Sequence, residues 1–225
     1  MNHQLIDIPI EQNTLQGELS HSTDSAGLII FSHGSGSSRL SPRNKFVAQY
    51  LNEQGFSTLL FDLLTPDEDQ RKERRFDIEL LSSRLISVTK WLRKDPEFQL
   101  LNFGFFGAST GSASAIQAAS ILGDDLIQAV VSRGGRPDLA RKFLKQLKSP
   151  LLLLVGEYDE VVLELNEIAY NMISSPKKLK VIPGATHLFE EAGTLERVAE
   201  EASNWFRKYL YWPTVSIQKD FIDER

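Results

Sequence analysis

The segment at residues 102–115, NFGFFGASTGSASA, holds the side chains most suited to chemistry. An apolar run ends at GASTG, residues 107–111, and a stretch of small residues follows. This spacing matches a G-x-S-x-G nucleophile elbow, in which a serine stands on a tight turn between a strand and a helix. Glycines two positions before and after the serine leave room for the backbone to reverse. The hydroxyl of Ser109 is therefore predicted to stand free at a helix N-terminus, whose unpaired N–H groups can stabilise an oxyanion.

The pattern alone does not identify an enzyme. Roughly one chain in ten of this length and composition would contain it by chance, and the alternative interpretation is a Gly/Ser turn at the surface. A serine nucleophile of this kind also needs an acid and a histidine. Each should follow a later strand, in the chain order serine, acid, histidine.

Both partners occur in that order. The apolar run PLLLLV at residues 150–155 is typical of a buried parallel strand, and it leads into GEYD, which ends at Asp159. The next apolar run, at 179–183, leads into GATH, which ends at His187. Open α/β sheets build their sites at the carboxyl ends of strands, where both groups are expected. We predict that Ser109, Asp159 and His187 form a catalytic triad.

The choice of histidine and acid depends on their positions. His187 alone among four histidines has the right place in chain order. The other histidines are His3, His21 and His33. Asp159 is preferred over Glu157 and Glu160, because a shorter acid further into the loop has the more usual reach to a histidine there. The two glutamates remain as alternatives.

Composition agrees with a single enzyme domain. A chain of 225 residues can bury one substantial core. Its net charge of −5 argues against a general attraction to nucleic acid, and no run of about 18 apolar residues predicts a membrane span. The absence of cysteine excludes a disulfide, a thiolate nucleophile and a cysteine metal site. The N-terminal residues have no secretory-signal pattern, so a cytoplasmic protein is expected.

The rest of the sequence alternates strands and helices after an antiparallel start. Strands are predicted at residues 4–9, 14–19, 28–32, 57–62, 103–106, 129–132, 150–155 and 179–183. Helices are predicted at 45–54, after an Asp77 cap, after the elbow, and at 137–146, 163–172 and 195–210. This order predicts an α/β fold: a mostly parallel sheet with an N-terminal antiparallel hairpin and helices on both faces. We expect one domain over residues 1–225, with its core at about 26–210 and a tail, 211–225, packed along the surface.

The chain resembles the α/β-hydrolase superfamily, and within it the dienelactone-hydrolase-like group, close to small bacterial hydrolases associated with phosphoribosyltransferase domains. The resemblance is carried by HGSGSSRLSPRN from His33, DLLTPDE from Asp62, RRFDIELL from Arg74, FGASTG from Phe106, SRGGRPDLA from Ser132 and PGATHLFEE from Pro183. It covers roughly residues 28–210 and implies the same triad. One departure is that the nucleophile is serine, where dienelactone hydrolase proper has cysteine. This difference argues against dienelactone itself as the substrate.

The resemblance also gives a role to the glycine loop at 33–38. The backbone N–H of Thr110, next after the serine, would be one donor of an oxyanion hole, and Gly34 or Ser35 would supply the other. A plain turn is the alternative for this loop, and His33 is expected to orient it rather than react. An acyl-enzyme would form and be hydrolysed with no metal or organic cofactor.

The size of one connection bears on the substrate. About sixteen residues separate Arg133 from Pro150, and a helix is expected to use most of them, so a cap domain cannot fit there. We therefore expect an open crevice that takes small, soluble carboxylic esters or lactones, as in a carboxylesterase. The charged residues at 67–75 are expected to form a solvated face that borders it.

Two other functions fit the same residues. An amidase or peptidase would use the same triad, and an α/β-hydrolase fold can serve as a non-catalytic binding protein. Nucleotide binding is disfavoured, because the glycine motif is mid-chain and no G-K-[ST] follows it. A monomer and a homodimer are both compatible with the sequence.

Two arginines, Arg133 and Arg136, flank a pair of glycines after the predicted strand at 129–132. Guanidinium groups are two-pronged donors that suit carboxylates and phosphates. Either arginine is a candidate anchor for an anionic substrate. The alternative is that they pair with loop carboxylates such as Asp62 or Asp138 and stabilise the fold.

Overall fold

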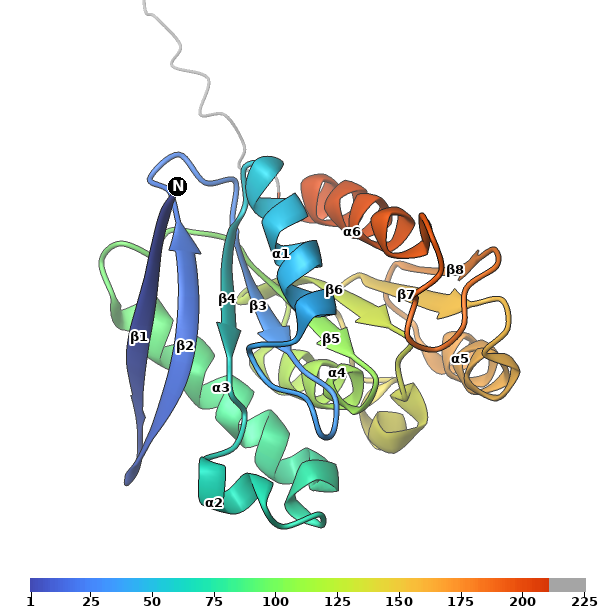
Figure 1. Cartoon of the computed structure of the whole chain (residues 1–225), viewed down its shortest axis with the longest axis horizontal. Coiled ribbons are helices and arrows are strands. Elements are labelled where there is room, and N and C mark those ends of the chain that lie inside the picture. The colour runs from blue at the N-terminus through green and yellow to red at the C-terminus, as the bar shows by residue number, and fades with distance from the viewer. Residues whose placement is uncertain (211–225) are drawn as a thin grey trace, which may run out of the picture.

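The structure is a computed structural model that describes residues 1–210. Its centre is an eight-stranded sheet with the order β1-β2-β4-β3-β5-β6-β7-β8 (Figure 1). The strands are β1 Asn2–Ile10, β2 Asn13–His21, β3 Leu28–Ser32, β4 Ser57–Phe61, β5 Phe103–Ala108, β6 Ile127–Arg133, β7 Leu151–Gly156 and β8 Lys177–Ile182. The first two form an antiparallel hairpin at one edge, and the other six run parallel. The expected α/β fold is confirmed.

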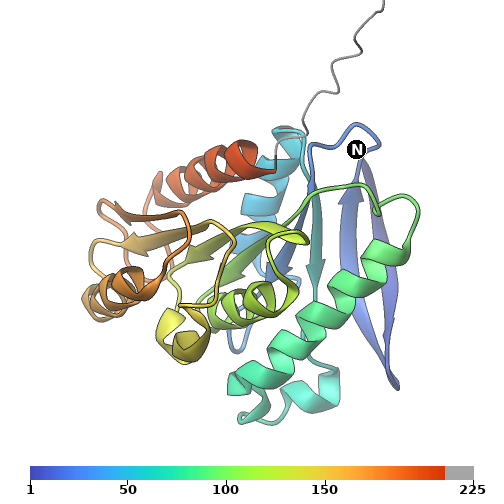
Figure 2. The same cartoon turned by 180° about the vertical axis from the view of Figure 1, so that it is seen from behind.

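Helices cover both faces of this sheet. They are α1 Pro42–Glu53, α2 Pro66–Asp69, α3 Ile78–Lys94, α4 Thr110–Leu122, α5 Glu160–Met172 and α6 Thr194–Tyr209, with 3-10 helices η1 Arg74–Phe76 and η2 Pro137–Phe143. One face carries α1 and α6, and the other carries α3, α4, η2 and α5 (Figures 1 and 2). None of the helices that the structure describes has the length and apolar character that a membrane crossing requires.

The central parallel strands β3, β4, β5 and β7 are largely apolar because both of their faces are covered. Every residue of β3, β4, β5 and β7 is buried. In contrast, β1 lies at the sheet edge, and most of its residues are exposed. The hydrophobic pattern thus separates central strands from the edge.

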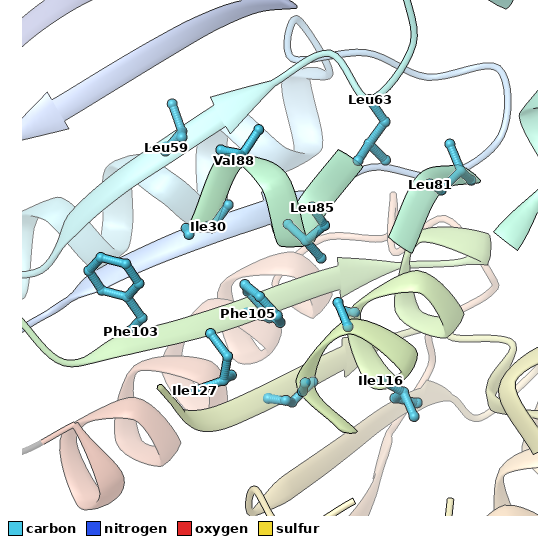
Figure 3. Packing of buried hydrophobic residues seen from close by; sticks show 14 of the residues in the cluster. Ile30, Leu59, Leu63, Leu81, Leu85, Val88, Phe103, Phe105, Ile116 and Ile127 are labelled. Atoms are coloured by element: carbon cyan, nitrogen blue, oxygen red, sulfur yellow. The ribbon is translucent and has the colours of Figure 1, made fainter. Parts of the chain in front are cut away.

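A large apolar cluster joins the sheet to α3 and α4 (Figure 3). The strands contribute Ile30, Leu59, Phe103 and Phe105, and the helices contribute Leu81, Leu85, Val88 and Ile116. All of these side chains are at most 2% exposed. The packing fixes α4 against the sheet, and with it the turn that precedes this helix.

Two local predictions need correction, and the structure contains a short helix that was not predicted. The helix expected at 45–54 begins earlier, at Pro42, because Ser41 caps it by accepting a hydrogen bond from the Asn44 N–H at 3.3 Å. The segment expected as a helix at 137–146 is the 3-10 helix η2, which is kinked at Ala140. A further helix, α2, was not expected, although Thr65 and Glu68 form a capping box there.

Two expectations about the limits of the domain differ in outcome. The connection at residues 134–150 holds only η2, so no cap domain is inserted there, as expected. The predicted tail, 211–225, lies outside the described residues, and its packing stays a prediction.

The contact between β5 and α6 generates a test of the fold. A Cβ added at Gly104 would lie 2.7 Å from Phe206 Cε1, and Phe206 is fully buried. We expect Gly104→Ala to lower the free energy of unfolding by about 1–3 kcal/mol, as other overpacked cores do.

Urea unfolding of Gly104→Ala, Phe206→Leu and the double variant measures this coupling. Removing ring atoms should relieve part of the clash, so the two losses should not add. Strictly additive losses would show that the glycine is not required by Phe206.

Candidate active site

Ser109 forms the turn between β5 and α4 and is the single residue that joins them. Its backbone lies at φ 51° and ψ −120°, a conformation that is strained for a residue with a side chain. Hydrogen bonds from a neighbouring loop hold it there. The Ser109 N–H donates to the Arg133 carbonyl at 3.1 Å, and the Ser109 carbonyl accepts from the Arg136 N–H at 3.2 Å. Such strain persists only where the surroundings fix it, and it is typical of functional sites.

The two glycines of the elbow are required by close backbone approaches. A Cβ at Gly107 would lie 2.5 Å from Ser112 Cα. A Cβ at Gly111 would lie 2.2 Å from the Ser32 carbonyl oxygen. Both distances are far below a van der Waals contact, and in both cases the obstacle is backbone that cannot swing aside. The spacing of the motif therefore has the steric cause that the sequence suggested.

Buried serines on α4 tie the elbow helix to the sheet. Ser112 Oγ donates to Ser132 Oγ at 2.5 Å, and Ser114 Oγ lies 2.7 Å from Ser32 Oγ. These pairs satisfy hydroxyl groups that have no access to water. Small polar side chains thus allow α4 to lie closer to the sheet than larger apolar ones would. The small residues after the elbow are evident in the sequence, but these pairs depend on the tertiary structure.

His187 and Asp159 contact each other at the same edge of the sheet. Asp159 follows β7, His187 follows β8, and His187 Nδ1 lies 2.6 Å from Asp159 Oδ2. Because a carboxylate only accepts, Nδ1 carries the proton of this bond, and in the neutral ring Nε2 is left as a base. The histidine side chain is 38% exposed and the aspartate 13%. The pair is therefore open to a ligand on its histidine side.

The other two candidate acids are placed differently. Glu157 Oε2 accepts a hydrogen bond from the Gly184 N–H at 2.7 Å, which ties it to the backbone before the histidine. Glu160 is the first residue of α5 and is exposed. Of the three, Asp159 is the acid that the structure brings to His187.

The loop after β6 lies between Ser109 and His187. A Cβ at Gly134 would lie 3.5 Å from His187 Cε1, and the flanking residues bind the Ser109 backbone as described above. Within residues 1–210, no hydrogen bond joins Ser109 Oγ to His187. Hydrogen bonds between a catalytic nucleophile and its base are often long or poorly aligned until substrate binds.

The glycine loop after β3 meets the elbow directly. A Cβ at Gly34 would lie 3.1 Å from Ser109 Cβ, so this glycine borders the serine side chain. The Ser35 N–H donates to Thr110 Oγ1 at 2.7 Å. Thr110 opens α4, and the first N–H groups of a helix have no partner within it. All three predicted oxyanion residues therefore surround the candidate nucleophile, but the Ser35 amide already has a protein acceptor.

His33 holds the glycine loop in place. Its Nδ1–H donates to the Gly34 carbonyl at 3.0 Å, and its Nε2 accepts from the Leu63 N–H at 3.1 Å. Both ring nitrogens are thus used by backbone groups, and the ring is neutral. Burial lowers the pKa of this imidazole below its ordinary value. The arrangement agrees with an orienting role for His33.

The two arginines after β6 have different surroundings. Arg136 makes two bonds of 2.8 Å to the Asp138 carboxylate, which raise the pKa of its guanidinium. Arg133 is only 7% exposed, and its Nε and Nη1 have no hydrogen-bond partner among the described residues. Asp62, the other carboxylate considered, binds Arg39 instead. Of the two arginines, Arg136 therefore pairs with a loop carboxylate as the structural alternative predicted, and Arg133 does not do so among the described residues.

Part of the charged segment at 67–75 borders the glycine loop. Asp69 and Arg75 form a salt bridge of 3.0 Å. Together with Gly34, Leu63 and Leu81, they line a small hollow beside the loop. The segment is thus less purely a solvated face than expected, because an ion pair from it reaches the edge of the candidate site.

No group of three or more histidine, aspartate or glutamate side chains in residues 1–210 is placed to hold a metal ion.

Comparison with known proteins agrees with this fold. The model of the dienelactone hydrolase family matches residues 17–213. The chain belongs to the dienelactone hydrolase family. This match places it among hydrolases of the α/β fold. The crystal structure of a dienelactone hydrolase from Anabaena variabilis is 47% identical and superposes with a TM-score of 0.89, covering 92% of this chain and 98% of that one.

Other relatives of this dienelactone hydrolase family member differ in length or in sequence. Two Mycobacterium tuberculosis proteins with a provisional phosphoribosyl transferase name are 53% identical over 88% of this chain. The match spans only 44% of their own length. Est1E from Butyrivibrio proteoclasticus, in a structure with bound ferulic acid, is 18% identical with a TM-score of 0.78, covering 91% of this chain and 99% of that one. At that identity the likeness concerns the fold alone.

The buried His33 predicts a pH dependence of stability. Because its folded pKa is lowered, the stability it contributes is complete above about pH 6.5 and is lost as pH falls through the folded value. The free energy of unfolding should therefore decrease between about pH 7 and pH 5, and His33→Gln should weaken that decrease.

Urea unfolding at several pH values measures this effect. His3→Gln is the matched control, because His3 is exposed in β1. Equal pH dependence in wild type and His33→Gln would contradict the role given to the buried ring.

Proposed function

We propose that the chain is a serine hydrolase that cleaves small carboxylic esters or lactones through an acyl-enzyme. One arrangement carries the proposal. Ser109 is held at φ 51° at the start of α4, and the His187–Asp159 pair lies on loops at the same edge of the sheet. A nucleophile, a base and an acid that orients the base are the parts that acyl transfer requires.

The chemistry follows from the roles of these three groups. His187 Nε2 takes the proton of Ser109 Oγ as the oxygen attacks the substrate carbonyl. Asp159 keeps the other ring nitrogen protonated and stabilises the imidazolium that forms. The protonated histidine then gives its proton to the leaving alcohol, and an acyl-serine ester remains. Water, activated by the same histidine, attacks that ester and releases the acid.

The negative charge on the carbonyl oxygen needs fixed donors. We assign one to the N–H of Thr110 and the other to the N–H of Gly34 or Ser35 in the glycine loop. The start of α4 supports the first donor, since its amide has no helical acceptor. The short bond from the Ser35 N–H to the Thr110 hydroxyl aims that amide at the elbow. A substrate oxygen that binds there would replace the hydroxyl as its acceptor.

The surroundings of the site favour a small acyl group. The connection after β6 holds only η2, and the hollow beside the glycine loop has the apolar lining residues Leu63, Leu64 and Leu81. Tyr158 and Leu188, next to the acid and the histidine, are 66% and 41% exposed. These apolar groups would contact a small organic substrate without enclosing a long chain.

The transferase name of the mycobacterial relatives does not carry over to this chain. More than half of each of those proteins lies outside the matched segment, since the match covers 44% of their length. That name gives no reason to assign phosphoribosyl transfer to the residues described above.

One prediction of this proposal concerns the triad. Ser109→Ala and His187→Ala should each remove nearly all hydrolysis of p-nitrophenyl acetate, and the double variant should lose no more, because the residues act as a unit. Asp159→Asn should also be severely impaired, because the wrong histidine tautomer is then favoured. Initial rates measure the losses, and circular dichroism checks that each variant is folded.

Glu157→Gln is the matched control for the acid. It should keep far more activity than Asp159→Asn, because the contact with His187 is made by the aspartate. Turnover like wild type in Ser109→Ala would overturn the assignment of the nucleophile. Failure of wild type to hydrolyse any ester, or to react with a fluorophosphonate probe, would favour a binding protein instead. Faster turnover of matched amides would favour an amidase.

A second prediction concerns the length of the acyl chain. Burial of each CH₂ group is worth about 0.8 kcal/mol, but an open site leaves the later ones in water. We expect kcat/KM for p-nitrophenyl esters to peak between acetate and butyrate. A steady rise towards long-chain esters would mean that another segment closes over the substrate.

A further inference from the structure

Arg133 is a buried cation with no salt-bridge partner among residues 1–210. It is the last residue of β6 and is 7% exposed. Neither its Nε nor its Nη1 has a hydrogen-bond partner among the described residues. Burial and the neighbouring Arg43 lower its pKa to about 10, so it stays charged at neutral pH. A charged group is rarely buried unless it is paired.

The charged groups nearest to Arg133 do not neutralise its guanidinium. Arg43 is a second guanidinium close enough to act on Arg133, and its partner is Glu190 at 2.7 Å. That glutamate side chain is 61% exposed, so its charge is well screened. Arg133 and Arg43 are therefore two neighbouring cations, and the carboxylate that pairs with Arg43, from Glu190, is largely solvated.

The position of Arg133 points to the candidate active site. In the parallel register it pairs with Ala108, the residue before Ser109, and its carbonyl accepts the Ser109 N–H. Its guanidinium carbon lies 6.0 Å from the ring centre of Phe189, two residues after His187. Arg133 thus stands between the end of the nucleophile strand and the histidine loop.

We propose that Arg133 binds an anionic oxygen group, a carboxylate or a phosphate, on the substrate of the Ser109 site. This inference rests on the proposed hydrolase function and narrows its substrate class. A guanidinium offers parallel N–H donors that match the oxygens of either group. The bound anion would pair the buried charge and accept from donors that have no partner in the part of the chain that the structure describes.

Arg136 provides the contrast that makes the inference testable. It belongs to the same loop, but Asp138 already holds its guanidinium with two bonds of 2.8 Å. Because these donors are already used by Asp138, few remain for a substrate. Arg136→Met is therefore a matched control for the removal of one arginine from this loop.

The experiment compares three acetate esters with the same acyl group: 3-acetoxybenzamide, 3-acetoxybenzoate and 3-acetoxyphenyl phosphate. The ratio of kcat/KM for an anionic ester to that for the neutral amide-bearing ester is measured in wild type, Arg133→Met and Arg136→Met. In Arg133→Met the ratio should fall by about tenfold or more, as expected for loss of a charge-assisted hydrogen bond. In Arg136→Met it should stay near the wild-type value. The anion whose ratio falls further identifies carboxylate or phosphate as the preferred group.

An unchanged ratio in Arg133→Met, which means equal losses of kcat/KM on neutral and anionic esters or no loss on either, would overturn the proposal. So would a larger fall in Arg136→Met. Thermal melting distinguishes a structural role of Arg133 from a role in substrate binding. A fold that needs Arg133 would melt at a markedly lower temperature as Arg133→Met, whereas removal of an unpaired buried charge should leave Tm equal or higher.

A binding measurement separates this inference from the proposed function. Calorimetric titration of Ser109→Ala with 3-hydroxybenzoate and 3-hydroxybenzamide requires no turnover. Selective binding of the anion that is lost in Ser109→Ala/Arg133→Met supports the anchor, even if esterase activity is never found. Equal binding of both compounds would overturn it, whatever the outcome of the triad test.

Discussion

The close approach of α4 to the backbone of β3 is the constraint on which the site depends. Where Gly111 faces the Ser32 carbonyl, a single added carbon would lie 2.2 Å from the oxygen. Because the helix starts this near the sheet, the chain must reverse within one residue, and Ser109 takes up the strain at φ 51°. In a nucleophile elbow, such a reversal exposes the serine hydroxyl at the start of a helix, where the first amides have no partner within the helix. The serine pairs between α4 and the neighbouring strands, and the apolar cluster beneath, keep the helix at that distance.

The parallel order of the strands brings the other groups to the same edge. Since β5, β6, β7 and β8 are neighbours and run in one direction, the loops that follow them meet. Glycine again permits the contact, because a Cβ at Gly156 would lie 2.5 Å from the Ala185 carbonyl oxygen. These tightly packed loops, with α5 beginning directly after Asp159, hold Asp159 Oδ2 and His187 Nδ1 2.6 Å apart. The geometry of the candidate site thus follows from backbone packing more than from its own side-chain contacts.

Charges around this edge are mostly paired, and the exception is informative. Arg39 binds Asp62, Arg75 binds Asp69 and Arg136 binds Asp138. Arg133, the most buried of these, has no such partner within residues 1–210. Proteins that break a local rule of stability often do so at functional sites, where an unsatisfied group is free to meet a ligand. The contrast between these arginines is visible only after each carboxylate has been assigned.

The sequence by itself determined the fold class, the elbow and the order of the candidate triad. Apolar runs such as 28–32 and 150–155 are buried on both faces, so their pattern is unambiguous, and the glycines beside Ser109 have a local steric cause. Secondary structure that depends on weak local signals was less predictable, as α2 and the 3-10 helix η2 demonstrate. Only the tertiary structure decided which acid meets His187 and which of Arg133 and Arg136 has a carboxylate partner among the described residues. Those choices depend on distances between loops far apart in the chain, which no local pattern of residues encodes.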